Sequence, residues 1–193
     1  MVETPMVQGP LDAYAPAFVA LEEVGLTIAL VPQPAQINLR GQAKVLATPV
    51  AETCAVLSLA HLVNAATTNG TWCSLGLGPD EWLLVGPPGV ASRTAADLAA
   101  KLADHHVSVV DVTANRVALD IAGPIAPALF ASLTSLDMAT LGPGRCAQTM
   151  LAKTQVILQS GPNPQSVRVF VRSSFARYLA DVIIDAAPLL GAP

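Results

Sequence analysis

The sequence has 193 residues, of which 52% are hydrophobic and only 12% are charged, and its formal net charge is −4 at pH 7. This composition excludes an intrinsically disordered chain, which is polar and highly charged, and the length fits one or at most two domains. The acidic balance also excludes the basic face on which nucleic-acid binding depends.

The small number of charged residues leaves much of the surface to be covered by uncharged side chains. A soluble monomer keeps its exterior charged and free of large apolar patches, and here 10 Lys and Arg with 14 Asp and Glu have to cover the whole surface. We therefore expect one face of the chain to be buried against another subunit. The alternative that the sequence leaves open is a genome that favours Ala, Gly and Pro.

The N-terminal part of the chain differs from the rest. Residues 1–20 contain three prolines and show no steady hydrophobic period, which predicts an extended N-terminal arm. The start of the chain has Glu3 and neither Lys nor Arg, so it does not resemble a signal peptide. Residues 21–193 are predicted to form a single domain. Alternating apolar residues predict its first strand over residues 24–30 and a second strand that contains Ile37 and Leu39.

Residues 49–66 are mostly helical by composition. Their densely apolar part, residues 54–66, contains Ser58, His61 and Asn64, and it is too short and too polar to span a bilayer. We therefore expect a buried helix here, and no contact with a membrane.

The middle of the chain predicts two pairs of strands around a helix. Strands over residues 71–77 and 82–85 are joined by a tight turn at residues 78–81. A helix follows over residues 92–106, with Ser92 as its cap. Residues 107–113 and 116–121 then alternate in hydrophobicity on either side of Ala114-Asn115, which predicts a β-hairpin.

The last third of the chain continues this alternation of strands and helices. Pro124 opens a helix that runs to about Leu133. Three strands follow, over residues 145–151, 156–159 and 167–171, and a final helix runs from Ser173 or Ser174 to about residue 187, before Pro188. Strands joined by short turns predict an α+β fold: an antiparallel sheet with helices on one face, without an internal repeat.

Residues that could carry chemistry are few. The cysteines at positions 54, 73 and 146 are odd in number and widely spaced, which predicts neither disulfides nor a zinc site but reduced thiols in the cytoplasm. No nucleotide-binding, metalloprotease or hydrolase motif is present. We interpret His61 as a core residue, and His105 and His106 point different ways at a helix end, so no metal site is predicted.

Three acidic residues and one tryptophan remain. Asp80-Glu81 lies in a turn and Asp111 lies in a strand, where a carboxylate bonds to a neighbouring loop more often than it performs acid–base chemistry. Trp82 follows the turn directly and is either part of the core, which we favour, or an interface anchor.

Residues 77–84 read LGPDEWLL and resemble a signature of the gamma subunit family of heterotetrameric sarcosine oxidase. Residues 110–116 resemble the V-D-[VL]-[ST]-x-x-R strand of that family, and residues 172–179 resemble its R-S-F-A-x-Y-L helix start. The resemblance covers roughly residues 24–187. The matching positions form the family motif and a possible subunit interface: Gly78, Pro79, Asp80, Glu81, Trp82, Arg116, Arg172, Ser174 and Phe175.

This resemblance implies a non-catalytic small subunit of a cytoplasmic flavoenzyme. Enzymes of this kind oxidise sarcosine to glycine, release hydrogen peroxide and pass a one-carbon unit to tetrahydrofolate. The resemblance implies alpha, beta and delta subunits as partners, with alpha as the main contact. It also implies that FAD, FMN, NAD and tetrahydrofolate are bound in those partners and not in this chain. A related small subunit occurs in N-methylglutamate dehydrogenase, so a subunit of a related N-methyl amino acid dehydrogenase remains an alternative.

Residues 109–144 also resemble the folate-binding domain of aminomethyltransferases. In those enzymes the next strand leads to a Gly-rich turn and to acidic residues that serve folate. Residues 149–156 of this chain have neither, which implies the same fold without catalytic or cofactor-binding residues. A stand-alone folate-binding protein and a peripheral membrane protein are two further alternatives.

Overall fold

The computed structural model of the protein describes residues 9–161 and 166–191. Ten strands form two five-stranded sheets. The first sheet has the order β1 (Thr27–Leu30), β7 (Arg116–Ala122), β10 (Val167–Arg172), β9 (Thr154–Ser160) and β8 (Cys146–Leu151). The second has the order β3 (Ala66–Thr68), β4 (Cys73–Gly78), β5 (Glu81–Gly86), β2 (Ala35–Arg40) and β6 (Ser108–Asp111).

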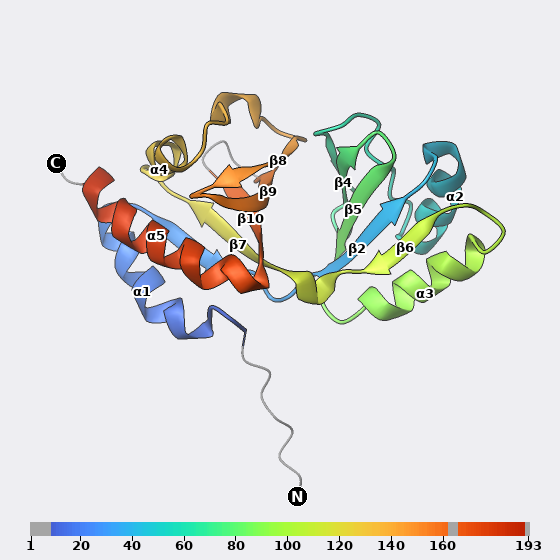
Figure 1. Ribbon diagram of the computed structural model, residues 1–193, viewed down its shortest axis with the longest axis horizontal. Helices are drawn as coiled ribbons and strands as arrows, with labels where there is room; N and C mark the ends of the chain where they lie inside the picture. Colours follow the sequence, from blue (N-terminus) through green and yellow to red (C-terminus); the bar gives the residue numbers. More distant parts are fainter. Residues whose placement is uncertain (1–8, 162–165, 192–193) are drawn as a thin grey trace, which may run out of the picture.

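Every pairing within these sheets is antiparallel. The helices lie on the outer face of each sheet, with α4 (Ala126–Leu133) and α5 (Ala176–Leu190) on the first and α2 (Ala43–Thr53) and α3 (Ala91–Lys101) on the second (Figure 1). The predicted α+β class with antiparallel strands and helices on one face is therefore confirmed, although two sheets take the place of one.

The two sheets are built from an internal repeat that the sequence did not reveal. The order β1-β2-α2-β3-β4-β5-α3 is followed by the matching order β6-β7-α4-β8-β9-β10-α5. In each unit the second to fifth strands form one sheet, while the first strand crosses over and pairs at the edge of the other unit's sheet. The expectation of no internal repeat was wrong, because the two units share their topology and not their residues.

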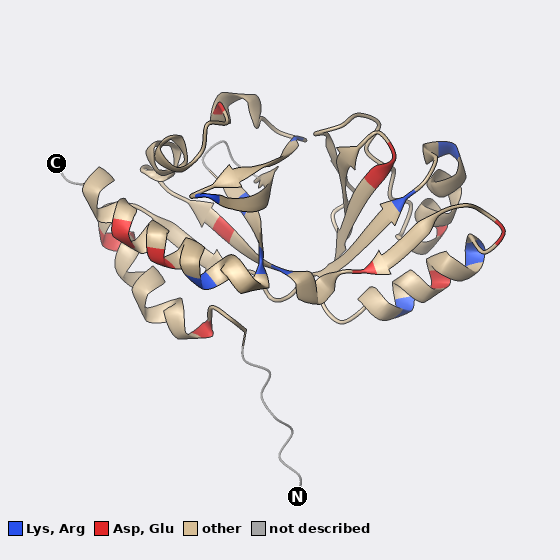
Figure 2. Cartoon of the chain, in the orientation of Figure 1, with Lys and Arg blue, Asp and Glu red and all other residues tan. Residues whose placement is uncertain are grey.

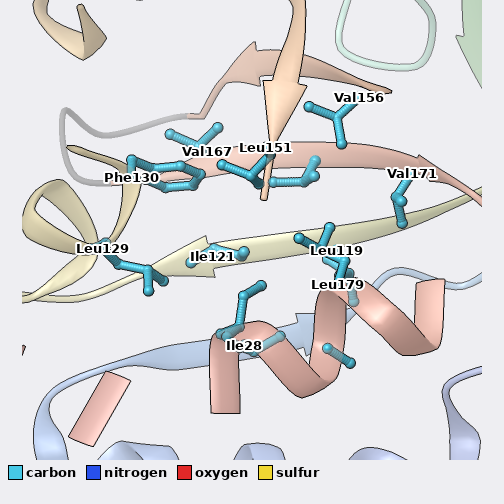
Figure 3. Close-up of a cluster of buried hydrophobic side chains, with 14 of the residues drawn as sticks. Ile28, Leu119, Ile121, Leu129, Phe130, Leu151, Val156, Val167, Val171 and Leu179 are labelled. Carbon is cyan, nitrogen blue, oxygen red and sulfur yellow. The ribbon is translucent and has the colours of Figure 1, made fainter. Parts of the chain in front are cut away.

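The core has three layers. The outer face of each sheet packs against its helices, and Figure 3 shows the larger of these two clusters, in which Leu119 and Ile121 of β7 contact side chains of β1, α4 and α5. The third layer lies between the two sheets, and we call it the inter-sheet core. It consists of eight buried side chains: Cys73, Leu75, Leu83, Val85, Ala118, Cys146, Ile157 and Phe170.

The N-terminal segment does not form the predicted extended arm where the structure describes it. A 3-10 helix (Asp12–Tyr14), the helix α1 (Ala15–Ala20) and a further 3-10 helix (Leu21–Val24) follow one another. Leu11 and Phe18 are 2% and 3% exposed, so this segment is part of the core. Residues 1–8 of the predicted arm lie outside the described residues.

The helix predicted to reach residue 66 ends at Thr53. Ala55 and Val56 have positive φ angles of 53° and 64°, and the Asn69 side chain donates hydrogen bonds to the carbonyl oxygens of Cys54 and Ala55, at 2.9 and 2.8 Å. These bonds satisfy carbonyl groups that a continuing helix would have bound. The apolar residues after them therefore fill the core from a loop.

The predicted hairpin over residues 107–121 was also wrong. β6 and β7 belong to different sheets, and the intended turn, Ala114-Asn115, lies in a 3-10 helix (Thr113–Asn115) between them. Other expected elements differ only at their ends: α3 begins at Ala91 without a side-chain cap, and α5 continues past Pro188. Gly123 has a φ of 120°, and a Cβ atom there would lie 2.4 Å from the Gly25 carbonyl oxygen, so the Gly-Pro pair after β7 requires glycine.

In the part of the chain that the structure covers, no helix has both the length and the apolar character that crossing a membrane requires.

The inter-sheet core can be tested with a matched pair of phenylalanines. Phe170 is fully buried between the sheets, whereas Phe175 is 47% exposed. Phe170→Ala should lower the free energy of unfolding by about 3–5 kcal/mol, because it leaves a cavity. Phe175→Ala should change it by less than about 0.5 kcal/mol. Urea titration followed by circular dichroism measures both, and equal losses would contradict a packed layer between the sheets.

Candidate functional site at the ends of the inter-sheet core

Ion pairs lie at both ends of the inter-sheet core, at corresponding places in the two units. Arg40 of β2 faces Glu81 of β5, with 2.6 Å between Nη2 and Oε2. Arg168 of β10 faces Asp120 of β7, with 2.7 Å from Nε to Oδ1 and 2.7 Å from Nη2 to Oδ2. Both are direct cross-strand pairs, but the basic residue lies on the second strand of one unit and on the fifth strand of the other.

The Asp120–Arg168 end is electrostatically balanced. The two-pronged contact matches the fork of a guanidinium, and the hydrogen bond to Asp120 raises the pKa of Arg168. A hollow of about 400 Å³ lies beside the pair. The Gln159 side chain lines it and donates a hydrogen bond to Cys73 Sγ at 3.3 Å.

The Glu81 end carries an excess of positive charge. The carboxylate accepts hydrogen bonds from Arg40 and from Asn38 Nδ2, the latter at 2.9 Å. Arg116 and Arg172 lie directly opposite each other on β7 and β10. We call Arg40, Arg116, Arg172, Asn38 and Glu81 the arginine cluster. Its three arginines against one carboxylate leave two positive charges in excess, in a chain whose net charge is −4.

Arg116 lies in an unfavourable position for a cation. It is half-buried, and burial, followed by the charge of Arg172, lowers its pKa, against an opposing effect of Glu81. Within residues 9–161 and 166–191, the guanidinium groups of Arg116 and Arg172 form neither a hydrogen bond nor an ion pair. Like charges placed directly across two strands destabilise a sheet.

The structure separates the nine motif residues into groups. Glu81, Arg116 and Arg172 come together in the arginine cluster, while Gly78, Pro79 and Asp80 form the β4–β5 turn, in which the Asp80 carbonyl oxygen accepts a hydrogen bond from Gly41 N at 3.0 Å. Ser174 and Phe175 follow β10 on the surface.

Trp82 points to the opposite face of β5. It is 3% exposed in the core under α2 and α3, and its Nε1 donates to the Ala60 carbonyl oxygen at 2.9 Å. The preferred interpretation of Trp82 as a core residue is confirmed. Asn38 and Arg40 were missed, although their alternation with the apolar Ile37 and Leu39 marks them as residues of the opposite sheet face.

The other polar candidates either have structural roles or are exposed to solvent. Asp111 accepts hydrogen bonds from Thr113 N at 3.0 Å and Ser92 Oγ at 3.3 Å, as expected for a residue that caps a loop. Its pKa is lowered, first by the side chain and backbone of Thr113 and then by Ser92. His61, predicted to lie in the core, is exposed because the helix that would have buried it is a loop. Among the described residues no group of three His, Cys, Asp or Glu could hold a metal ion.

The three thiols are buried and have raised pKa values. Burial raises the pKa of Cys54 and of Cys146 to about 11 and that of Cys73 to about 12. Cys146 Sγ donates to the Ala65 carbonyl oxygen at 3.3 Å. Since the thiolate is the reactive form, none of the three is suited to nucleophilic chemistry.

A larger hollow, of about 770 Å³, lies where the β1–β2 and β6–β7 connections cross. Its polar wall groups already have partners within the protein: Gln33 Nε2 donates to the Arg116 carbonyl oxygen at 2.8 Å, and Ser173 Oγ donates to the Ala114 carbonyl oxygen at 2.9 Å. A ligand site needs convergent polar groups that are free to bind. We therefore interpret these contacts as ones that hold the two connections together, and not as a ligand site.

The sequence is similar to that of known proteins. The model of the "Sarcosine oxidase, gamma subunit family" matches residues 33–188. Sarcosine oxidase subunit gamma of Corynebacterium sp. (strain P-1) is 35% identical over 126 residues, which is 64% of this chain and 60% of the relative. The corresponding protein of Arthrobacter sp. is 34% identical over 131 residues, 67% of this chain and 63% of the relative. The matched part of the chain thus spans about 60% of the length of these relatives.

Two solved structures are similar in fold. A chain of the heterotetrameric sarcosine oxidase from Corynebacterium sp. U-96, in complex with pyrrole 2-carboxylate, has a TM-score of 0.84 at 24% identity, with 98% of each chain covered. The glycine cleavage system aminomethyltransferase T from Bartonella henselae has a TM-score of 0.63 at 17% identity, with 89% of this chain and 49% of that chain covered.

The charge balance of the arginine cluster can be tested at Glu81. Glu81→Gln should lower the free energy of unfolding by about 1 kcal/mol at low ionic strength, because three arginines would then share a site without a carboxylate. The loss should shrink at high salt, which screens the remaining repulsion. Asp97→Asn is the control, since Asp97 contacts Arg93 at 4.0 Å on an exposed helix face. Urea titrations at low and high salt compare them, and equal effects would contradict a special role for Glu81.

The raised pKa values of the thiols predict slow modification. At pH 8 the native chain should react with a thiol reagent much more slowly than the same chain in urea, because Cys54, Cys73 and Cys146 stay protonated and buried. Ala100→Cys, which places a thiol on the exposed face of α3, should react at once and serves as the control. Rapid modification of the native wild-type chain would show that the cysteines are accessible.

Proposed function

Since this chain belongs to the sarcosine oxidase gamma subunit family, we propose that it is the non-catalytic small subunit of a heterotetrameric sarcosine oxidase-type flavoenzyme. In this proposal the chain stabilises the alpha subunit, its main contact, within a cytoplasmic complex that also contains beta and delta subunits. The complex oxidises sarcosine to glycine, passes a one-carbon unit to tetrahydrofolate and releases hydrogen peroxide. FAD, FMN, NAD and tetrahydrofolate are bound by the partner subunits.

The packing between the two sheets is the observation that supports a non-catalytic role most strongly. A ligand between the sheets would have to displace the inter-sheet core, whose Leu75, Leu83 and Phe170 are fully buried. Removing such side chains from their packing costs several kcal/mol each. The residues present therefore do not fit a folate-sized group at this place, and we derive no reaction step in this chain.

The β8–β9 turn supports the same proposal. Ala152 and Lys153 turn the chain with positive φ angles of 49° and 66°, where glycine is the usual residue. No acidic residue occurs from Thr149 to Val156. The stretch that resembles the folate-serving segment of aminomethyltransferases thus keeps its hairpin and lacks the side chains. This disfavours a stand-alone folate-binding protein.

We propose that residues 9–191 act as one structural unit within the complex. The two sheets exchange edge strands and share the inter-sheet core, so neither half is complete by itself. The small number of charged residues supports burial of one face against the partner. A small subunit of a related N-methyl amino acid dehydrogenase would have the same properties, and the substrate oxidised by the purified complex distinguishes the two.

The proposal predicts where the flavin will be found. The chain co-expressed with its large partner subunits should purify in a complex with the visible absorbance of flavin, whereas the chain expressed alone should be colourless and self-associated or poorly soluble. Calorimetry of the isolated chain with tetrahydrofolate should give no heat of binding. Turnover of an N-methyl amine, or tight cofactor binding, by the isolated chain would overturn the proposal.

A further inference from the structure

We propose that Arg116 and Arg172 bind carboxylates on an acidic segment of the partner subunit, and thus form a charged anchor of the subunit interface. The inference rests on the proposed function, since it presumes a partner. It identifies the chemistry by which this chain would recognise that partner.

Neither arginine is bound by a carboxylate within the described residues. The two guanidinium groups lie across from each other without a hydrogen bond or ion pair among the described residues, and Arg116 is half-buried. Of the acidic groups at the ends of the inter-sheet core, Glu81 is bound by Arg40 and Asn38, and Asp120 is bound in two places by Arg168. A half-buried cation is costly without an anion, so an external anion is favoured here.

The internal repeat shows what the corresponding position of the first unit holds. When the two ion pairs are superposed, Gln36 corresponds to Arg116 and Val85 corresponds to Arg172, because Gln36 and Val85 are also directly opposite each other, on β2 and β5. The same position in the fold is therefore occupied by an uncharged pair. The fold does not require the arginines, and their charge serves something other than the sheet.

The sheet face beside the two arginines is open to solvent. Cys146 of β8 is 1% exposed on the inner face, whereas Met150, four residues further along β8 and on the same face, is 50% exposed. Met150 pairs with Gln155 of β9, which is also exposed, and the register of β9 and β10 places Gln155 next to Arg172. Three inner-face residues, Met150, Gln155 and Arg172, are thus exposed in a row across the sheet, and the half-buried Arg116 continues that row.

This row fits a protein segment better than a free small anion. It is open and includes an apolar side chain, and Phe175, three residues after Arg172, is 47% exposed. Arginine, methionine and aromatic residues are the types enriched at protein interfaces. The local excess of positive charge on an acidic chain is complementary to Asp or Glu, and a guanidinium fork binds a carboxylate through two parallel hydrogen bonds.

A competition experiment tests the proposal. Tagged variants are co-expressed with the untagged wild-type chain and the large partner subunits, and the ratio of the two small chains in the purified flavin-containing complex gives their relative affinity. Arg116→Gln with Arg172→Gln should lose about 100-fold against the wild type, since hydrogen bonds between charged groups are among the strongest interface contacts. Arg116→Lys with Arg172→Lys, which keeps the charge but not the fork, should lose about 10-fold.

The matched control removes two positive charges elsewhere. Arg93 and Lys44 are exposed, on α3 and α2, and Arg93→Gln with Lys44→Gln should compete within about threefold of the wild type. Thermal unfolding of the isolated chains provides a second readout. The Arg116→Gln, Arg172→Gln variant should unfold at the same or a higher temperature than the wild type, because a repulsion is removed, and this excludes misfolding as the cause of lost binding. If the double variant does not fold, the exposed Arg172→Gln alone should still lose about 10-fold.

The outcomes are separable. If the wild-type chain forms no complex with flavoprotein subunits, the proposed function fails. If it does, but the glutamine variant competes as well as the control, the docking proposal is overturned. A third result would also overturn it. In that result, inorganic phosphate or succinate stabilises the wild-type chain and not the glutamine variant, while the two chains join the complex equally well. The arginines would then bind a small anion.

Discussion

The exchange of one strand between the two units is the constraint on which the rest of the structure depends. β1 and β6 each complete the sheet of the opposite unit, by pairing with β7 and β2. Pulling the units apart would therefore expose backbone donors and acceptors along both edges, which costs free energy wherever water does not replace them. The exchange holds the two sheets face to face (Figure 1), and their inner faces can therefore pack as a core.

This arrangement decides where polar residues can lie between the sheets. The centre of the layer is closed and apolar, and polar side chains are confined to its ends, where cross-strand partners and solvent are available. Each unit has one such ion pair, Arg40–Glu81 and Asp120–Arg168. The basic residue lies on the second strand of the first unit and on the fifth strand of the second unit. The two units thus share a cross-strand ion pair at the same place but have different residues there. The repeat is for this reason not visible in the sequence.

The same physics decides which elements of the fold the sequence could predict. Strands with a regular alternation, such as β7 and β10, could be predicted because one face of each is buried under helices. The partner of a strand could not, since hydrophobic periodicity does not say which sheet buries the face, and the supposed hairpin of β6 and β7 failed for this reason. The loop after α2 looked helical because its apolar residues are buried, and composition does not distinguish a buried loop from a buried helix.

The candidate site was predictable in part. The motif residues Glu81, Arg116 and Arg172 were identified from the resemblance, but their meeting in one cluster depends on two features of the fold. β7 pairs with β10 within the second unit, and the exchange of β1 and β6 holds that sheet opposite β5. Figure 2 shows how sparse charged residues are on this chain. In such a chain, two adjacent arginines that no internal carboxylate binds lower the stability of the isolated fold, and an acidic partner removes that penalty only on binding. Their cost in the free subunit then becomes a preference for the assembled complex, since a group that is unsatisfied only in the free state shifts the equilibrium toward association.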